Sequence, residues 1–301
     1  MSYFQFRLED PGAPDFAADV VEILNSTLPR DSATSPENAA STLDSISARH
    51  SAENGTTDSF FWWFWDSILD LSRQVPHDSP EQDRLAEIVK ALHNLPPKKV
   101  KLQEEQKSSV LQAWRGLPSF DQIREKLSDD TRAADESQRK ERAVNLNAFA
   151  ARVAGLGIVP LDTYAIWALV DALEGTMTPI RGAPDEVNSD PAAVDGIHYK
   201  VKSAAAWMVH AGHVLYGRDE EVHGATAGPL WLLPKKEAIE LRLRCRGTNG
   251  LCPERWLLWK ERFAAIRDCD SLDATTREEA EKAYVAMERT ENSAANVTGT
   301  Y

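Results

Sequence analysis

The chain has 301 residues, of which 42% are hydrophobic and 27% charged, as in an ordinary globular protein that buries its own core. Its formal net charge of −13 argues against a nucleic-acid partner and against anionic membrane surfaces, because both are themselves negatively charged. The sequence has no apolar run of transmembrane length and no CxxC pair, so we expect neither a membrane span nor a structural zinc site.

The N-terminal part of the sequence predicts one helix and a linker. Residues 1–10 carry charges and no long apolar run, so we expect no secretory signal and a cytoplasmic location. Apolar residues recur with helical spacing over residues 14–25, which predicts a helix within an N-terminal segment of residues 1–29. Residues 30–57 are rich in Ser, Thr, Ala and Asn, which indicates a flexible linker with room for one short helix after Ser35-Pro36.

The clearest start and stop signals follow the linker. Residues 58–75 have a helical pattern that Pro76 ends. Ser79-Pro80-Glu81-Gln82 then combines an N-cap serine, a proline in the first turn and a glutamine at the capping-box position, which predicts a second helix. That helix is expected to end before Pro96-Pro97. Because few residues separate the two helices, we expect them to form an antiparallel hairpin.

Helical patterns continue through the rest of the chain, separated by polar, Gly-rich or Pro-rich breaks such as residues 175–191. The remaining predicted helices cover residues 104–115, 120–127, 136–154, 162–174, 193–216, 253–267 and a last segment from residue 275. The stretch at residues 217–250 is the least regular and could hold a short helix after Pro234. We therefore predict an all-α fold, a single irregular helical bundle of about ten helices over residues 58–290, with a disordered tail at residues 291–301.

Two of the predicted helices each carry a pair of carboxylates on one face. The four acidic residues are Asp66, Asp70, Asp171 and Glu174. Carboxylate oxygens are ligands for Mg²⁺, which bridges to the phosphates of a substrate, so Asp66, Asp70 and Asp171 are candidate metal ligands. Asp171 and Glu174 are also candidate catalytic residues. The alternative is that these pairs are ordinary solvated charges, since Arg73 stands near Asp70 and the DDxxD cluster of common terpene cyclases is absent.

Aromatic residues accompany both acidic pairs. Rings beside a metal-bound diphosphate could stabilise a carbocation through their negatively charged faces. The alternative is that they form the hydrophobic core. The candidate pocket residues are Trp62, Trp65, Asn145, Tyr164, Trp167 and Trp207.

Two further polar groups are candidates for catalysis. His210 stands three residues before His213, and such a pair could act as general acid and base or could pack into a helix interface. Arg152 shares a helix face with Asn145 and could bind a phosphate or carboxylate. The alternative for Arg152 is a buried structural ion pair with an acid such as Glu174.

Several stretches between about residues 60 and 290 share a pattern with a known family. They include Phe64-Trp65, residues 72–77 (SRQVPH), residues 145–152 (NLNAFAAR), residues 166–169 (IWAL), residues 205–207 (AAW) and residues 259–263 (WKERF). In these stretches the chain resembles a fungal, mainly ascomycete, family called domain of unknown function 3632. The resemblance implies an all-helical fold and a fungal source, and it implies no reaction. More distantly, the chain is similar to fungal humulene synthases, which are helical sesquiterpene cyclases.

Two hypotheses from different classes remain open. The first is a helical protein of fungal small-molecule (secondary) metabolism with an apolar, aromatic-lined pocket, in its sharpest form a Mg²⁺-dependent sesquiterpene cyclase, a lyase acting on farnesyl diphosphate. The second is a non-catalytic helical module that binds another protein. A closed aromatic cavity beside carboxylates would favour the first, and an exposed aromatic patch would favour the second. A homodimer is compatible with either.

Overall fold

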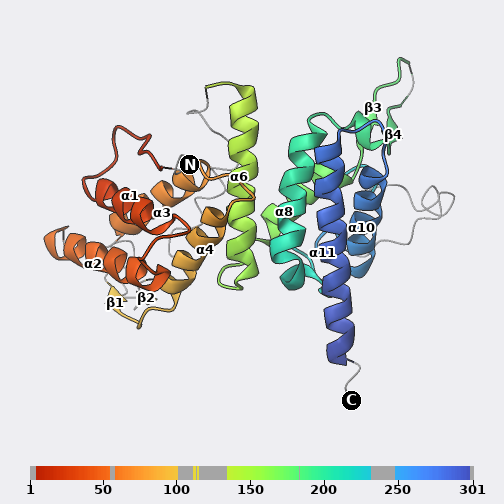
Figure 1. Ribbon diagram of the computed structural model, residues 1–301. Helices are drawn as coiled ribbons and strands as arrows, with labels where there is room; N and C mark the ends of the chain where they lie inside the picture. The colour runs from red at the N-terminus through yellow and green to blue at the C-terminus, as the bar shows by residue number, and fades with distance from the viewer. Residues whose placement is uncertain are drawn as a thin grey trace. The chain divides into compact units, whose positions relative to one another are not determined.

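The computed structural model describes residues 5–54, 58–100, 111–112, 114, 134–182, 184–231 and 248–298. Within these residues the chain has nine α-helices and two small two-stranded sheets, which confirms the predicted all-α class (Figure 1). None of the helices described there is both long and apolar enough to cross a membrane. The chain divides into two compact units, unit 1 (Met1–Val159) and unit 2 (Pro160–Tyr301), whose positions relative to one another are not determined.

Unit 1 is a layered helical bundle. Its elements are α1 (Phe16–Thr27), α2 (Pro36–Asn54), α3 (Asp58–Ser72), α4 (Pro80–His93), β1 (Lys99–Val100), β2 (Leu111–Gln112) and α6 (Glu136–Gly155). The helix α4 has its main contacts with α2 and α6, whereas α3 contacts α1, α2 and α6. The short α3–α4 connection therefore does not make these two helices each other's main partners, which corrects the predicted hairpin.

The structure corrects two further predictions about order in the chain. The expected flexible linker contains the 19-residue helix α2, which begins at Pro36 and buries Ala39, Ala40, Leu43 and Ile46. The expected disordered tail is helical as far as Thr298, and Glu291 within it accepts hydrogen bonds from Trp256 and Lys260. Composition underestimated the first helix and missed the second, because most helical stability in proteins comes from packing against neighbouring elements.

The segment between α4 and α6 is described only in part. Residues 111–112 form β2, which pairs antiparallel with β1 instead of belonging to the helix predicted at residues 104–115. The rest of that predicted helix, apart from Trp114, lies outside the described residues, as does the helix predicted at residues 120–127.

Aromatic rings of α3 form the core of unit 1. Phe60, Phe61, Phe64 and Trp65 are all fully buried, and each has its ring centroid within about 6 Å of the ring of Trp114. Most of these contacts are edge-to-face, the geometry that the ring quadrupole favours. The rings fill the centre of unit 1, so this part of the predicted aromatic set acts in packing.

A buried glutamine joins the end of α3 to α4 and α6. The side-chain amide of Gln82, on α4, donates to the carbonyls of Ser72 and Val75 at the end of α3 and to that of Asn145 on α6. These distances are 3.0–3.2 Å, and Gln82 is completely buried. The sequence signal that suggested a capping box therefore marks a residue that connects three helices.

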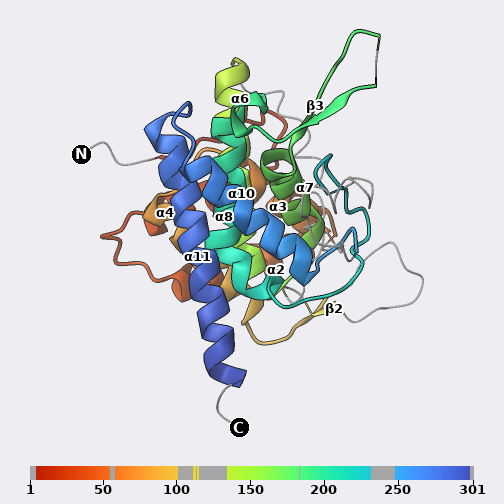
Figure 2. The same ribbon diagram turned by 90° about the vertical axis from the view of Figure 1, so that its right-hand side faces the viewer.

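Unit 2 is built around α8. Its elements are α7 (Asp162–Leu173), β3 (Thr176–Thr178), β4 (Glu186–Asn188), a 3-10 turn (Pro191–Ala193), α8 (Ile197–Leu215), α10 (Pro253–Arg267) and α11 (Ala274–Thr298). The helix α8 packs against α7 and α11, and α10 packs against α11 (Figures 1 and 2). Buried alanines, including Ala204 and Ala211 on α8 and Ala280 and Ala283 on α11, allow the close approach of these helices.

Between α7 and α8 the chain forms a hairpin. The segment predicted as a loop at residues 175–191 contains β3 and β4, which pair antiparallel from Thr176↔Asn188 to Thr178↔Glu186. The hairpin extends away from the helices of unit 2 (Figure 2). The short helix predicted after Pro234 lies outside the described residues.

We predict that replacing Gln82 with leucine lowers the free energy of unfolding by about 1–3 kcal/mol, because buried carbonyls lose a hydrogen-bond donor. Urea unfolding measures the change. Glu87→Leu, at an exposed position on the same helix, is the control and should change stability much less. Equal stability of the two variants would show that the Gln82 contacts do not stabilise the fold.

Candidate functional site

An extended N-terminal segment lies across the surface of unit 1. We call residues 5–10 the strap. Its Phe6 is enclosed, with 3% of its surface exposed, whereas the residues on either side of it are exposed. The backbone N–H of Phe6 donates to Oδ1 of Asn25 at 2.7 Å, and the Nδ2 amide of Asn25 donates back to the carbonyl of Phe6 at 3.1 Å. A single side chain of α1 thus pairs with both main-chain polar groups of Phe6.

The next strap residue is held in the same way. The N–H of Arg7 donates to Oε1 of Gln74 at 3.0 Å, and Nε2 of Gln74 donates to the carbonyl of Arg7 at 2.8 Å. Gln74 is the second residue after the end of α3. A side-chain amide carries the same donor and acceptor as a peptide group, so each of these two side chains pairs with one strap residue as the opposite residue of an antiparallel strand would.

The third contact of the strap is an ion pair. Both carboxylate oxygens of Glu9 accept hydrogen bonds from the guanidinium of Arg142 on α6, at 3.0 and 2.8 Å. The side chain of Arg142 is 8% exposed and that of Glu9 is 27% exposed. A planar guanidinium in a bidentate pair with a carboxylate is among the strongest and most directional polar contacts in proteins. We call the side chains of Asn25, Gln74 and Arg142, together with the enclosed site that the Phe6 ring occupies (its seat), the strap groove.

A polar cleft of about 480 Å³ opens beside this ion pair. Its lining includes Glu9, Arg142, Arg73, Gln74 and Asn145. Nδ2 of Asn145 donates to the carbonyl of Arg73 at 2.9 Å, so this predicted pocket residue positions the turn that follows α3. The cleft is lined by charged and amide groups rather than by the apolar rings that the sequence predicted.

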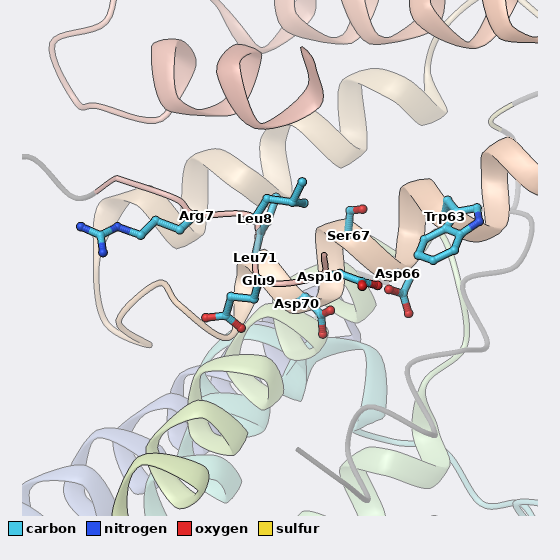
Figure 3. A pocket seen from close by; sticks show the side chains of 9 residues that line it. All are labelled: Arg7, Leu8, Glu9, Asp10, Trp63, Asp66, Ser67, Asp70 and Leu71. Carbon is cyan, nitrogen blue, oxygen red and sulfur yellow. The ribbon is translucent and has the colours of Figure 1, made fainter. Parts of the chain in front are cut away.

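The predicted metal ligands Asp66 and Asp70 lie beneath the strap. Figure 3 shows both carboxylates on one side of α3, next to Asp10 of the strap, as their spacing predicted. The cavity among them has about 10 Å³, which is room for a single water molecule. Asp70 forms an ion pair with Arg73 at 3.4 Å. Among the described residues, no group of three or more His, Cys, Asp or Glu side chains is arranged to hold a metal ion, and Mg²⁺ binding stays a prediction.

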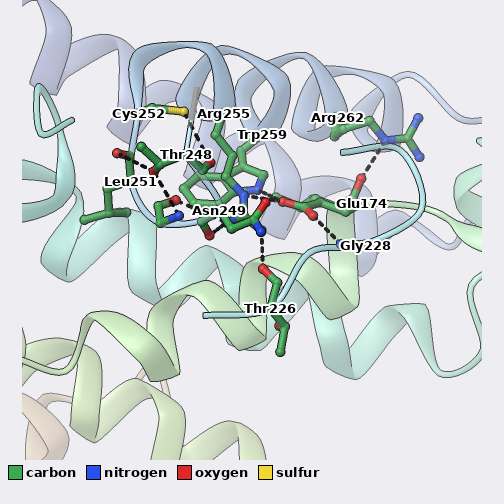
Figure 4. A network of polar contacts seen from close by, with 12 residues as sticks. Glu174, Thr226, Gly228, Thr248, Asn249, Leu251, Cys252, Arg255, Trp259 and Arg262 are labelled. Carbon is green, nitrogen blue, oxygen red and sulfur yellow. Dashed lines mark hydrogen bonds and ion pairs between the residues drawn. The ribbon is translucent and has the colours of Figure 1, made fainter. Parts of the chain in front are cut away.

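In unit 2 the predicted catalytic residue Glu174 is fully buried in a polar network (Figure 4). Its Oε1 accepts hydrogen bonds from Nε of Arg255 at 2.7 Å and from Nε1 of Trp259 at 2.9 Å. Its Oε2 accepts from the backbone N–H of Gly228 at 2.6 Å. A Cβ atom at Gly228 would collide with Glu174, so only glycine fits there. Glu174 therefore anchors a loop to α10.

The partner of Glu174 has its other hydrogen bonds to loop carbonyls. Nη1 of Arg255 donates to Asn249 and Gly250, and Nη2 donates to Thr226. The guanidinium also lies over the ring of Trp259, 5.2 Å from its centroid. The carbonyl groups and the ring offset the cost of burying the charge, which an ion pair alone often fails to do. The network fixes two loops of unit 2 onto its helices, and sequence reasoning had no signal for Arg255.

Arg152 is buried as predicted, but with a different partner. Its Nε donates to Asp83 of α4 at 2.6 Å, and its Nη1 donates to the carbonyl of Ala148 one turn earlier in α6. The expected pair with Glu174 is therefore wrong, because Glu174 is paired with Arg255. The ion pair of Arg152 joins α4 to α6 within unit 1.

The other predicted pocket residues have separate environments. Tyr164 and Trp167 form an edge-to-face pair with centroids 5.5 Å apart, and Nε1 of Trp167 donates to the carbonyl of Gly224. Trp207 is completely buried in α8, where it packs in the core. Trp62 is 45% exposed and contacts Trp63, with their ring centroids 4.9 Å apart.

The remaining titratable candidates lie at or near the surface of unit 2. Desolvation raises the pKa of the Asp171 carboxyl, and the nearby Lys200 ammonium partly opposes this effect. His210 is half-buried and His213 is exposed, and both belong to α8. Since Asp66 and Asp70 belong to unit 1 and Asp171 to unit 2, the predicted convergence of these carboxylates on one cavity stays a prediction.

We predict that Arg255→Met lowers the free energy of unfolding by about 3–5 kcal/mol, because it leaves the Glu174 carboxylate buried without its counter-charge. Urea unfolding followed by tryptophan fluorescence measures the loss. The control is Arg267→Met, which removes an arginine from partly exposed ion pairs and should cost less than about 1 kcal/mol. Similar losses for both variants would contradict the structural role of Arg255.

Of the comparisons with known proteins, the family match extends across both units. A family model described as "Protein of unknown function (DUF3632)" matches residues 65–263, from within α3 to within α10. The match includes Gln74 and Arg142 of the strap groove, whereas the strap and Asn25 lie before it. No curated protein and no solved structure matches the chain. The matched family is the one that the sequence resembles, and the match covers more than half of the chain. This protein therefore belongs to the DUF3632 family of proteins of unknown function.

Proposed function

We propose that this protein is a non-catalytic interaction module, in which unit 1 binds an extended polypeptide segment of a partner protein in the strap groove. The observation that supports this most strongly is the double hydrogen bonding of Phe6 and Arg7 by Asn25 and Gln74. Contacts to main-chain groups are available to any polypeptide in the same extended conformation, as in other modes of peptide recognition that use main-chain hydrogen bonds.

The way the strap is attached also supports exchange with a partner segment. Beyond Glu9 the chain turns back, with Gly12 N–H donating to Oδ1 of Asp10 and Ala13 N–H donating to its carbonyl. The turn precedes α1, so the strap can leave the groove without unwinding a helix. Segments with few buried side chains and many exposed residues open at the lowest free-energy cost. The strap fits this description, since Phe6 is its one enclosed side chain.

An exposed aromatic pair lies close to the same groove. Trp62 is exposed, and its neighbour Trp63 lines the small cavity beneath Leu8 and Asp10 of the strap. Aromatic residues are enriched at protein interfaces, where they supply much of the binding energy. A partner segment longer than the strap could continue along α3 onto these rings.

The cyclase hypothesis has less support, because two of its candidate carboxylates have other partners. Glu174 is committed to a structural network and Asp70 is paired with Arg73, so neither is an available metal ligand without rearrangement. A role in fungal secondary metabolism, binding of an apolar small molecule, and a cytoplasmic location stay predictions. The interaction module is supported by the contacts that Asn25, Gln74 and Arg142 make with the strap.

We predict that a peptide with the sequence of residues 5–12 binds the full chain once the chain's own strap is weakened by Phe6→Ala and Glu9→Ala. Fluorescence anisotropy of the labelled peptide measures the affinity. The opened variant should bind at least about tenfold more tightly than the unmodified protein, because the strap reduces the fraction of grooves that are empty.

Adding Asn25→Ala and Gln74→Ala to the opened variant should abolish this binding, because the main-chain contacts are then lost. Circular dichroism and thermal unfolding of each variant show whether the helical fold is intact. Absence of saturable peptide binding to a correctly folded opened variant would contradict the proposed function.

A further inference from the structure

We infer that the strap groove selects partner segments with a phenylalanine followed by a glutamate three positions later, bound in extended conformation. This inference rests on the proposed function and specifies its partner. The strap itself supplies the pattern with Phe6 and Glu9, and it acts as the chain's own competitor for the groove. The groove contacts the side chains of Phe6 and Glu9 and the main-chain groups of Phe6 and Arg7.

The aromatic position is selected by enclosure. Among Phe6, Arg7, Leu8 and Glu9, only Phe6 is buried. Its main-chain groups are fixed by Asn25 on α1, so the ring enters its seat from a defined point on the backbone. A smaller side chain at this position would leave the seat underfilled, which weakens binding through lost dispersion contacts and lost apolar burial.

The acidic position is selected by the shape and burial of Arg142. Its guanidinium forms two parallel hydrogen bonds with a carboxylate, and a neutral amide offers only one acceptor oxygen. Because the Arg142 side chain is largely buried, losing its partner carboxylate leaves a charge with reduced access to water. Glutamine at this position should therefore bind more weakly than glutamate.

The side chains at the two positions between them contribute little to selection. The main chain of Arg7 is held by Gln74, but its side chain is exposed and points away from the neighbouring helix (Figure 3). Leu8 is 39% exposed. Asn25, Gln74 and Arg142 therefore contact positions one, two and four of a four-residue segment, and this order also fixes the direction of the chain in the groove.

The test uses the opened variant, Phe6→Ala with Glu9→Ala in the full chain, and a series of peptides with the sequence of residues 5–12. In the peptide, Glu9→Gln and Phe6→Ala should each weaken binding about tenfold or more, since tenfold corresponds to the loss of one good contact. Gln5→Ala in the peptide, at an exposed position outside the contacts, is the matched control and should change affinity less than about threefold.

A second protein variant separates specific recognition from a general charge effect. With Arg142→Gln added to the opened variant, the parent peptide should bind more weakly, and the glutamate and glutamine peptides should bind alike. Equal binding of all peptides to the opened variant would overturn the selectivity and leave the interaction module standing. Absence of binding by every peptide would overturn both.

Discussion

Both units depend on the same constraint: a polar group that is withdrawn from water must find a partner. Helices satisfy their own main-chain groups, so the constraint acts where the chain leaves a helix. In unit 1 the side-chain amides of Asn25 and Gln82 pair with main-chain groups of Phe6 and of the end of α3. In unit 2 the Glu174–Arg255 pair serves loop groups at Thr226, Gly228, Asn249 and Gly250. The side chains that hold the loops and helix ends in place are thus mostly polar.

The two networks differ in how easily they can be exchanged. The network of unit 2 is buried, and Gly228 fits so closely against Glu174 that no other residue could replace it. The strap contacts lie at the surface and involve a short segment that precedes α1. The same kind of hydrogen bond therefore stabilises a loop in one unit and, in the other, holds the strap that we propose a partner segment can replace. This difference is the reason for placing the function in the strap groove rather than at Glu174.

Local signals in the sequence predicted most of the helices. The helix α4 begins after Ser79 as predicted, although the Ser79 side chain makes no cap hydrogen bond, and the helix predicted from residue 136 begins after Asp135, whose side chain caps it. These signals work because a cap is made by residues adjacent in sequence. The helix α2 was predicted only as a short helix after Ser35-Pro36, and its full length of 19 residues was not predicted, because a polar composition does not show which residues pack against other helices.

The candidate site could not be predicted in the same way, because its partners are far apart in the sequence. Glu9 and Arg142 are separated by 133 positions, and Arg7 and Gln74 by 67. Asn and Gln occur throughout the chain and give no pattern that marks two of them as contacts of the strap. The acidic pair Asp66 and Asp70 was found from its helical spacing, which correctly placed both carboxylates on one side of α3. Spacing alone did not indicate that a strap covers them.

Hydrogen exchange at the amides of Phe6 and Arg7, measured by NMR on the isotope-labelled full chain, tests the central claim most directly. These two amides donate to Asn25 and Gln74, so they should exchange more slowly than those of a disordered segment. An excess of unlabelled peptide with the sequence of residues 5–12 should remove this protection while the helices of unit 1 keep theirs. Exchange at the rate of a disordered chain before any peptide is added, or protection unchanged at saturating peptide, would contradict a groove that holds the strap exchangeably.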